Sequence, residues 1–494
     1  MALPRQPKIL LAAVGLVCII GLFTFRLHSR DAFFATRPGY LSPNRIPTLS
    51  QKTGQLDPEA HKLPSADSFR AHFNALTRVK NITVAEAKAG CHWPQDEDVN
   101  FQFSADAEWV VTDRPDDEIN SRRKAWQEYI QGKMIPWEKV KDKFEGRGVV
   151  ILAGNRDTAM HLKVVLRRLT MLRSKIPMEI HYWGDEMNKA TREDLASLYQ
   201  PTSFNDLSQP HNIIQVKKDG PFINFQLKTA ALINSKFAEP LLLDSDNVPV
   251  LDPATLYDSH VYQEYGTVFW PDIARSWPQN PAWAITNTPC RMDEYEQESG
   301  QLMVGKQRYW YHLQLAAWLN NEEGKYYNEF LLGDKDMFRF AWHALKTSYG
   351  RPKKWLTSVG VLNDDYYCGH SFAQYHPDDG RVAFLHGGLA KSTALEVMRW
   401  NKEEKGGYFR HYKRAPTDED PAQIVHVGIK FDGATYKPNH TEDFKVAMCT
   451  DMRDLEVGNL DDILPGWEKE YEELGGYWML EQETTAKQTL ARNN

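Results

Sequence analysis

The chain has 494 residues, of which 42% are hydrophobic and 25% charged, and its formal net charge is −7 at pH 7. This length exceeds that of one small domain and suffices for a large core with insertions. Charges of both signs spread along the chain without a basic stripe, which argues against a nucleic-acid-binding protein.

The first informative element is the apolar run Ile9 to Phe25, which contains no charge. Its length of about 17 residues lies at the short end of what spans a bilayer. Arg26 follows directly, which favours an uncleaved signal-anchor over a cleaved signal peptide. We therefore expect a cytoplasmic tail at residues 1–8, a transmembrane helix at 9–25 and a lumenal remainder, as in a single-pass type II membrane protein.

Two further features suit a lumenal, oxidising compartment. Asn81 and Asn439 each begin an Asn-X-Thr triplet, which is the acceptor for N-glycosylation. Four cysteines outside the apolar run form an even set without the CxxC spacing of metal sites: Cys91, Cys290, Cys368 and Cys449. They could form two disulfides with any of three connectivities, or remain buried thiols.

The next segments precede the expected catalytic domain. Residues 26–65 are rich in Pro, Ser, Thr and Arg, which predicts a flexible stem. Residues 66–145 are mixed and charged with scattered Trp, and are interpreted as a helical or irregular lead-in. The catalytic domain is expected at 146–494.

Apolar runs alternate with helical periodicity from residue 146 onward. The predicted strands are 147–155, 178–185, 213–216 and 240–246, and the predicted helices are about 157–172 and 222–236. Asp157 is a candidate cap for the first helix. This alternation predicts an α/β fold with a mostly parallel sheet and helices on both faces. Ligands of such sheets bind beyond the carboxyl ends of the strands.

The later elements carry polar clusters beside apolar runs. Glu298 to Gln301 lead into a short strand and then a helix, and Asp334 precedes another helix that it could cap. The run RVAFLHGGLAKS, at 381–392, reads as a strand ending at His386, with glycines and a lysine behind it. Neutral imidazole can ligate a metal, and glycines let backbone N–H groups approach phosphate.

Asp244 and Asp246 directly follow the apolar strand PLLL. Two carboxylates held together repel each other unless they share a cation or a proton. A hard divalent metal suits such oxygen ligands and leaves positions for phosphate oxygens. It could therefore bridge a nucleotide diphosphate and stabilise it as it leaves. Two other Asp-X-Asp pairs, at 96–98 and 418–420, lie in polar surroundings that are typical of solvated loops.

Two readings from other classes remain as alternatives. A phosphatase of the haloacid-dehalogenase type also ends an apolar strand in Asp-X-Asp, where the first Asp attacks phosphate. That motif normally opens the first strand of its domain, whereas three predicted strands precede Asp244, and the spacing of Gly333 to Asp336 does not fit its later motif. A lumenal binding protein without activity is the other alternative, and the intact acidic motifs argue against it.

Five long motifs, in this order, resemble the fungal Golgi alpha-mannosyltransferase family: KTAALINSKFAEPLLLDSDNVPVLDPATLY, GTVFWPD, EYEQESGQLMVGKQRYW, FLLGDKDMFRFAW and FLHGGLAK. Members of this family extend and branch mannan outer chains with alpha-1,2- or alpha-1,3-linked mannose. The similarity covers about residues 146–392. It implies a GT-A-like nucleotide-sugar-binding fold, a type II anchor in the Golgi membrane, GDP-mannose as donor, a mannose-containing glycan as acceptor and manganese as cofactor. Complexes with other Golgi mannosyltransferases are a further expectation.

The same resemblance implies the roles of the ligands of metal and diphosphate. Asp244 and Asp246 look like ligands of the metal and the diphosphate, and His386 resembles the third metal ligand of related transferases. Lys391 looks like a diphosphate contact, assisted by the backbone of Gly387 and Gly388.

The resemblance also implies residues at the sugar. Asp334 and Asp336 look like the acidic pair near the transferred sugar, and they are predicted as catalytic together with Glu298. Lys228 is a candidate donor contact.

The predicted reaction retains the alpha configuration of the donor and forms an alpha-1,2 linkage. An alpha-1,3 linkage or transfer from another nucleotide-sugar is the alternative. The sequence identifies no carboxylate as a nucleophile, which favours attack on the face that the phosphate leaves, with the phosphate taking the proton of the acceptor.

Overall fold

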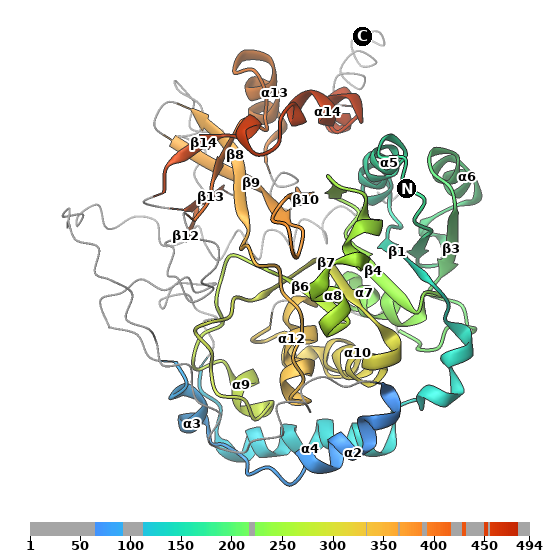
Figure 1. Ribbon diagram of the computed structural model, residues 1–494, viewed down its shortest axis with the longest axis vertical. Helices are drawn as coiled ribbons and strands as arrows, with labels where there is room; N and C mark the ends of the chain where they lie inside the picture. The colour runs from blue at the N-terminus through green and yellow to red at the C-terminus, as the bar shows by residue number, and fades with distance from the viewer. Residues whose placement is uncertain are drawn as a thin grey trace, which may run out of the picture.

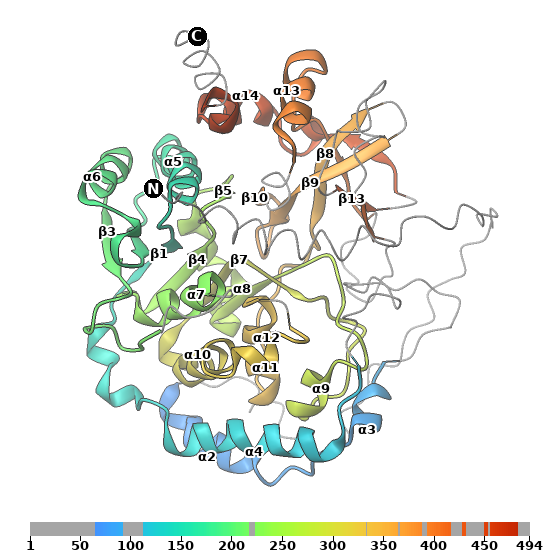
Figure 2. The ribbon, with the colours of Figure 1, turned by 180° about the vertical axis from the view of Figure 1, so that it is seen from behind.

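The computed structural model describes residues 65–91, 112–216, 223–331, 333–363, 366–387, 393–415, 427–430, 449–452 and 455–482. The predicted membrane helix at 9–25, the stem up to residue 64 and the Asn439 triplet lie outside these residues. Within them, no helix combines the length and the apolarity that crossing a bilayer requires. Figure 1 and Figure 2 show two sheets, with helices around the first and a layer of helices below.

The first sheet has, within the described residues, six strands in the order β3-β2-β1-β4-β7-β6. The strands are β1 (Arg147–Leu152), β2 (Met178–Tyr182), β3 (Thr202–Asp206), β4 (Glu239–Leu243), β6 (Thr267–Pro271) and β7 (Gln297–Val304). β1 to β4 run parallel, and β7 and β6 add an antiparallel edge beside β4. The sheet is therefore mixed, and its parallel part confirms three of the four predicted strands.

Helices cover both faces of this sheet because successive apolar side chains along each strand point to opposite faces. Val149 and Ile151 pack on the face of α5 (Arg156–Met171) and α6 (Lys189–Leu198). Val150 packs on the opposite face, in one cluster with the apolar side chains of α7 (Ile223–Asn234) and α10 (Lys306–Asn320). Each fully buried aliphatic side chain contributes roughly 1.5–3 kcal/mol to folding. The prediction of helices on both faces is confirmed.

The predicted strand at 213–216 is wrong. This segment pairs with no strand of the described residues. Instead, the side chain of Asn234 accepts a hydrogen bond from the backbone amide of Ile214 at 3.0 Å and donates one to the backbone carbonyl of Ile214 at 3.1 Å. The strand that pairs with β2 is the half-buried edge segment 202–206. The cap of α5 is also different from the prediction: Asn155 accepts from the amide of Thr158. Asp157 lies in the first turn, where a negative charge suits the helix dipole.

The lead-in region is helical and packs against the rest of the chain. It contains α2 (Phe69–Leu76), α3 (Val84–Lys88) and α4 (Asp116–Gly132), which lie below α10 and α12 in both views (Figures 1 and 2). Arg123 of α4 is buried and donates to the carbonyls of Ile82 and Ala284. Trp126 donates to the carbonyl of Ile285, at the end of α9 (Pro281–Ile285). The lead-in therefore shares a core with residues 146–345.

The second sheet is antiparallel and was not predicted, apart from its strand at 382–386. Its strands are β5 (Asn247–Pro249), β8 (Thr357–Asn363), β9 (Tyr366–Tyr375), β10 (Val382–His386), β11 (His411–Lys413), β12 (Val427–Lys430), β13 (Cys449–Met452) and β14 (Val457–Asn459). The remaining helices are α8 (His260–Tyr265), α11 (Gly324–Tyr327), α12 (Lys335–Ala344), α13 (Leu395–Glu404) and α14 (Trp467–Glu473). β4 belongs to the first sheet and β5 to the second, so residues 244–246 lie at their junction.

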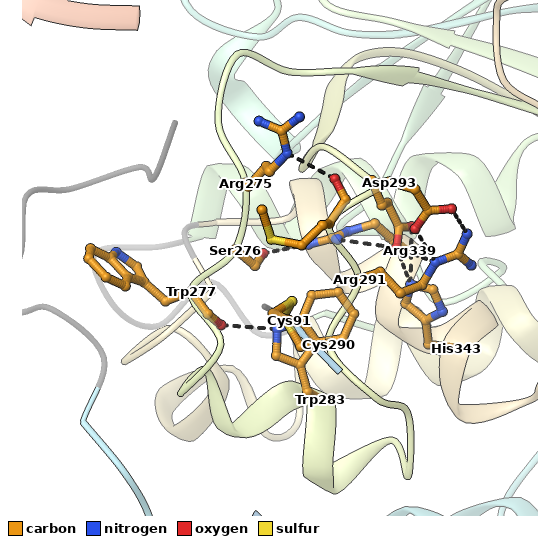
Figure 3. The surroundings of a disulfide bond; sticks show 12 residues. Cys91, Arg275, Ser276, Trp277, Trp283, Cys290, Arg291, Asp293, Arg339 and His343 are labelled. Carbon is orange, nitrogen blue, oxygen red and sulfur yellow. Dashed lines mark hydrogen bonds and ion pairs between the residues drawn. A yellow bond between two sulfur atoms is a disulfide. The ribbon is translucent and has the colours of Figure 1, made fainter. Parts of the chain in front are cut away.

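Two disulfides fix the pairing that the sequence left open. Cys91 is bonded to Cys290, with a Cα–Cα distance of 5.3 Å, and Cys368 to Cys449, with 4.8 Å. Figure 3 shows the first bond beside Trp283 of α9. This bond joins the lead-in to the chain after α9, and the second joins β9 to β13.

We expect non-reducing peptide mapping by mass spectrometry to recover these two pairs. The variant with Cys368→Ser and Cys449→Ser should lose about 4 kcal/mol of unfolding free energy, because the bond closes a long loop. Urea unfolding of the variant and the wild type checks the second expectation. A mixed pairing, or free thiols at these positions in the native chain, would contradict the structure.

Candidate functional site

The turn after β4 holds two acidic side chains in a fixed backbone. The amide of Asp244 donates to the carbonyl of Gly300 on β7 at 2.8 Å. The side chain of Asn247 is fully buried and donates to the same carbonyl at 2.8 Å, while its amide donates to the carbonyl of Asp244. Residues 244–247 are therefore anchored at both ends, with Asp246 between the anchors.

β10 brings a histidine to this turn. His386 is the last residue of β10 and pairs with Asn247 of β5. Its Nε2 atom lies 3.3 Å from Oδ1 of Asp246 and 3.8 Å from Oδ2 of Asp244. One ligand atom from each of the three side chains lies within 4.8 Å of the others. The structure thus brings together the three residues that were predicted to hold a metal.

This donor set fits a divalent cation. Neighbouring ligands of a six-coordinate ion with metal–oxygen bonds of about 2.1 Å lie about 3 Å apart, so small side-chain shifts would close the group. Burial disfavours the charged form of His386, but Glu298 and Asp246 outweigh it and raise its pKa to about 10. The pocket therefore stabilises positive charge between its carboxylates, which a metal ion would supply in place of the proton.

Glu298 lies behind His386. Its Oε2 atom is 3.7 Å from Nδ1 of the imidazole, and Oε1 accepts from the amide of Gly300 at 2.7 Å. Burial would raise the pKa of Glu298, but His386 and the Gly300 amide are the main causes that lower it to about 2. A carboxylate on the second nitrogen of a metal-binding histidine fixes the orientation of the ring. Gly300 leaves room for that ring, since a Cβ there would lie 2.5 Å from its Cε1.

Lys228 of α7 contacts the other side of the acidic group. Its Nζ atom lies 2.7 Å from Oδ1 of Asp244, 3.7 Å from Oδ1 of Asp334 and 3.4 Å from Oγ of Ser299. Burial would lower the pKa of Lys228, but Asp244 and Asp334 raise it above its ordinary value. A carboxylate offers about four lone-pair positions, so Asp244 can face both this ammonium group and a metal.

Asp334 adjoins this group, just before α12. Its side chain is 3% exposed and caps no amide of α12 through a hydrogen bond, although Asp334 occupies the cap position. Among the described residues, its Oδ2 atom has no hydrogen-bond partner. Burial raises the pKa of Asp334 to about 6, with Lys228 opposing and Asp244 adding to the shift.

Asp336 lies in a different charged cluster. Its Oδ1 atom accepts from Nε of Arg339 at 2.8 Å and from the amide of Gln297 at 3.1 Å. Arg339 also donates to Ser276 at 2.6 Å, and Figure 3 shows these two residues near the disulfide. Its Nη1 atom lies 3.7 Å from a carboxylate oxygen of Glu294. The structure thus brings Asp334 to the metal-binding group and places Asp336 in a buried ion pair.

Of the other predicted site residues, some lie within the described residues and some outside them. The amide of Gly387 donates to the carbonyl of Asp246 at 3.3 Å. Gly388 and Lys391 lie outside the described residues. Asn81 is exposed, two residues before Thr83 caps α3.

Some supporting residues were missed. Lys335 lies 2.7 Å from both Asp272, after β6, and Glu296, before β7. These ion pairs hold the start of α12, and therefore Asp334, against the carboxyl side of the first sheet. Their partners are remote in sequence, so no local spacing could have revealed them. A pocket beside Asp246 is likewise lined by Tyr471 and other aromatic residues of the C-terminal part.

The comparisons with known proteins agree with this arrangement. Residues 146–287 and 282–376 match a family model described as "Mannosyltransferase putative". Alpha-1,2-mannosyltransferase MNN23 of Candida albicans is 24% identical over 321 residues, covering 54% of this chain and 53% of that protein. Alpha-1,2-mannosyltransferase MNN22 of the same organism is 31% identical over 364 residues, covering 64% and 57%. The chain thus spans little more than half the length of these two relatives.

Among solved structures, the mannosyltransferase Ktr4p of S. cerevisiae in complex with GDP is 11% identical, with a TM-score of 0.29, covering 60% of this chain and 84% of that one. The family match includes α7, which carries Lys228, the turn after β4, which carries Asp244, and β7, which carries Glu298. Residues 146–376 of the chain are thus similar to a family model of mannosyltransferases and to fungal proteins named alpha-1,2-mannosyltransferases.

Proposed function

We propose that the chain is a metal-dependent alpha-mannosyltransferase that transfers mannose from GDP-mannose to a mannan or oligomannose acceptor. The observation that carries this proposal is the group formed by Asp244, Asp246 and His386 at the carboxyl end of β4. Its composition suits a divalent cation and a diphosphate. The names of the sequence relatives supply the sugar and favour an alpha-1,2 linkage, with alpha-1,3 as the alternative.

A bound divalent cation, for which we propose Mn²⁺, would neutralise charge on the diphosphate of the donor. Asp244, Asp246 and Nε2 of His386 would hold it. In this proposal Lys228 would donate hydrogen bonds to the diphosphate as negative charge grows there. Glu298 would keep the imidazole in the orientation that binding requires, which is a positioning role rather than contact with the sugar.

The reaction that we propose retains configuration. The hydroxyl oxygen of the acceptor forms a bond to the anomeric carbon on the face from which the phosphate oxygen departs. The proton of that hydroxyl passes to the departing phosphate, so no protein base is required. In this proposal Asp334, next to Lys228, would accept a hydrogen bond from a sugar hydroxyl, which its Oδ2 atom, without a partner in the described residues, supports.

The setting that we propose is the Golgi lumen, with the chain anchored by residues 9–25 as a type II membrane protein. The uncharged run at these residues supports the anchor. The two disulfides support an oxidising compartment. A GT-A-like architecture and complexes with other Golgi mannosyltransferases belong to the same proposal.

We expect the full chain, purified in detergent, to transfer mannose from GDP-mannose to an oligomannose, and to leave UDP-galactose and UDP-N-acetylglucosamine unused. A chelator should stop transfer, because two carboxylates and an imidazole hold the diphosphate only through a cation. Added Mn²⁺ should restore it, and linkage-selective mannosidases then read the bond formed.

Three results would contradict the proposal. They are transfer that continues in excess chelator, transfer from a UDP-sugar in preference to GDP-mannose, and release of phosphate from simple esters without sugar transfer. The last result would favour the hypothesis that the chain is a phosphatase.

A further inference from the structure

Two large hydrophobic side chains of the described residues stand exposed, Met171 and Phe225. Met171 is the last residue of α5, so it lies roughly 22 Å along the axis from the start of that helix. Phe225 is 42% exposed and lies in the first turn of α7, one turn before Lys228. Single exposed apolar residues are common on protein surfaces, so exposure alone does not indicate a function for Phe225. The residues around it provide the evidence.

The ring of Phe225 packs against the turn that precedes Asp334. A Cβ at Gly333 would lie 3.1 Å from its Cδ1 and 3.2 Å from its Cγ, and Gly333 has a positive φ of 67°. Residues three apart in a helix share one face. Phe225 and Lys228 therefore both contact the turn at residues 333–334. The ring of Phe225 packs on Gly333, and Nζ of Lys228 lies 3.7 Å from Oδ1 of Asp334.

Asp334 adds an independent observation. Its carboxylate is buried, yet its Oδ2 atom has no hydrogen-bond partner in the described part of the chain. A buried acceptor without a partner is costly, and water, an ion or a ligand can satisfy it. The residue that carries this acceptor directly follows Gly333, on which the exposed ring of Phe225 packs.

From this juxtaposition we infer that Phe225 and Asp334 form a subsite for the acceptor sugar. The inference rests on the proposed function and adds the residues that bind its second substrate. A pyranose has a face of C–H groups that packs on an aromatic ring, and hydroxyl groups at its rim. The ring of Phe225 carries that face, and Oδ2 of Asp334 accepts a hydrogen bond from one hydroxyl. Apolar surface with a few placed polar atoms is the usual composition of such sites.

The position favours the acceptor over the donor sugar. The donor mannose is linked to the diphosphate, so it lies among the polar groups around Asp244. Phe225 lies about 4.5 Å before Lys228 along the axis of α7, since the helix rises about 1.5 Å per residue. Its ring is 42% exposed there, whereas the side chain of Lys228 is 14% exposed.

The test is a comparison of three variants of the full chain, with GDP-mannose and an alpha-linked mannobiose as substrates. Phe225→Ala should raise the apparent KM for mannobiose about ten-fold or more, because it removes the packing surface. The dissociation constant of GDP, measured by calorimetry with Mn²⁺, should change less than about two-fold, since GDP lacks the acceptor sugar. Phe225→Tyr should retain the wild-type KM within about three-fold, because the ring remains.

Met171→Ala is the matched control, because it removes the other exposed apolar side chain away from α7, and it should change neither constant. An unchanged KM for mannobiose in Phe225→Ala, or equal losses for mannobiose and GDP, would overturn the inference. Failure of the proposed function gives a different pattern, because the wild type itself would then transfer no mannose.

Discussion

Asp246→Asn is expected to lower mannose transfer by a factor on the order of 10³ or more, because the variant loses one of three metal ligands. The side chain is 10% exposed and approaches His386 at 3.3 Å, so the substitution keeps its shape and removes its charge. The turn itself rests on Asn247 and the Gly300 carbonyl, and should persist. Initial rates with GDP-mannose, together with Mn²⁺ binding by calorimetry, measure the effect.

A second readout does not depend on catalysis. In the metal-free wild type Asp246 is one of the groups that raise the pKa of His386, so Asp246→Asn should lower that pKa. An NMR titration of the imidazole would show this shift. Asp258→Asn is the control with the same change, because Asp258 is 82% exposed and lies 3.8 Å from Arg147, at the start of β1 and away from the metal-binding group. Retained transfer in Asp246→Asn, or an equal loss in Asp258→Asn, is incompatible with the metal assignment.

The sequence allowed the metal-binding group to be predicted because its two aspartates directly follow the apolar strand β4 and its histidine ends the apolar strand β10. Asp244 and Asp246 lie in the turn that the Asn247 amide closes on the Asp244 carbonyl, and both side chains approach His386. The same spacing gives the opposite result at Asp334 and Asp336. There a helix begins, and residues two apart are turned about 200° from each other, so one faces Lys228 and the other Arg339. The sequence pattern is the same, and only the local backbone distinguishes the two pairs.

Some strands of the fold could likewise be predicted from their own residues, whereas others depend on partners that are remote in sequence. β1 and β4 are runs of mostly buried apolar residues, and β2 alternates apolar with polar residues, so all three could be recognised directly. β3 is an edge strand with the polar sequence TSFND, and its half-buried residues carry no apolar alternation. β8 and β9 of the second sheet bury polar side chains such as Thr357, His370 and Gln374. The pairing of β8 with β11 and of β9 with β13 joins segments remote in sequence, which periodicity cannot reveal.

The acidic pair at the start of α12 should show opposite effects on stability. Asp336→Ala leaves Arg339, which is 1% exposed, without its nearest carboxylate, and should cost about 3–5 kcal/mol of unfolding free energy. The loss should appear at pH 5 and at pH 8 alike, because Arg339 stays charged throughout. Urea unfolding at both pH values measures it. Asp142→Ala, which changes an exposed aspartate, is the control and should cost less than about 0.5 kcal/mol.

Asp334→Asn should instead stabilise the metal-free chain at pH 8 while lowering mannose transfer. The pKa of Asp334 rises from 3.8 to about 6 on folding, so its folded form binds a proton more tightly. That contribution to stability is fully present below about pH 4 and is lost as the pH rises through about 6. An uncharged amide avoids the loss, so the gain at pH 8 should reach roughly 1–3 kcal/mol and vanish near pH 4. Destabilisation at pH 8, or a gain that is independent of pH, would show that the Asp334 carboxylate is held by partners rather than left open for a sugar hydroxyl.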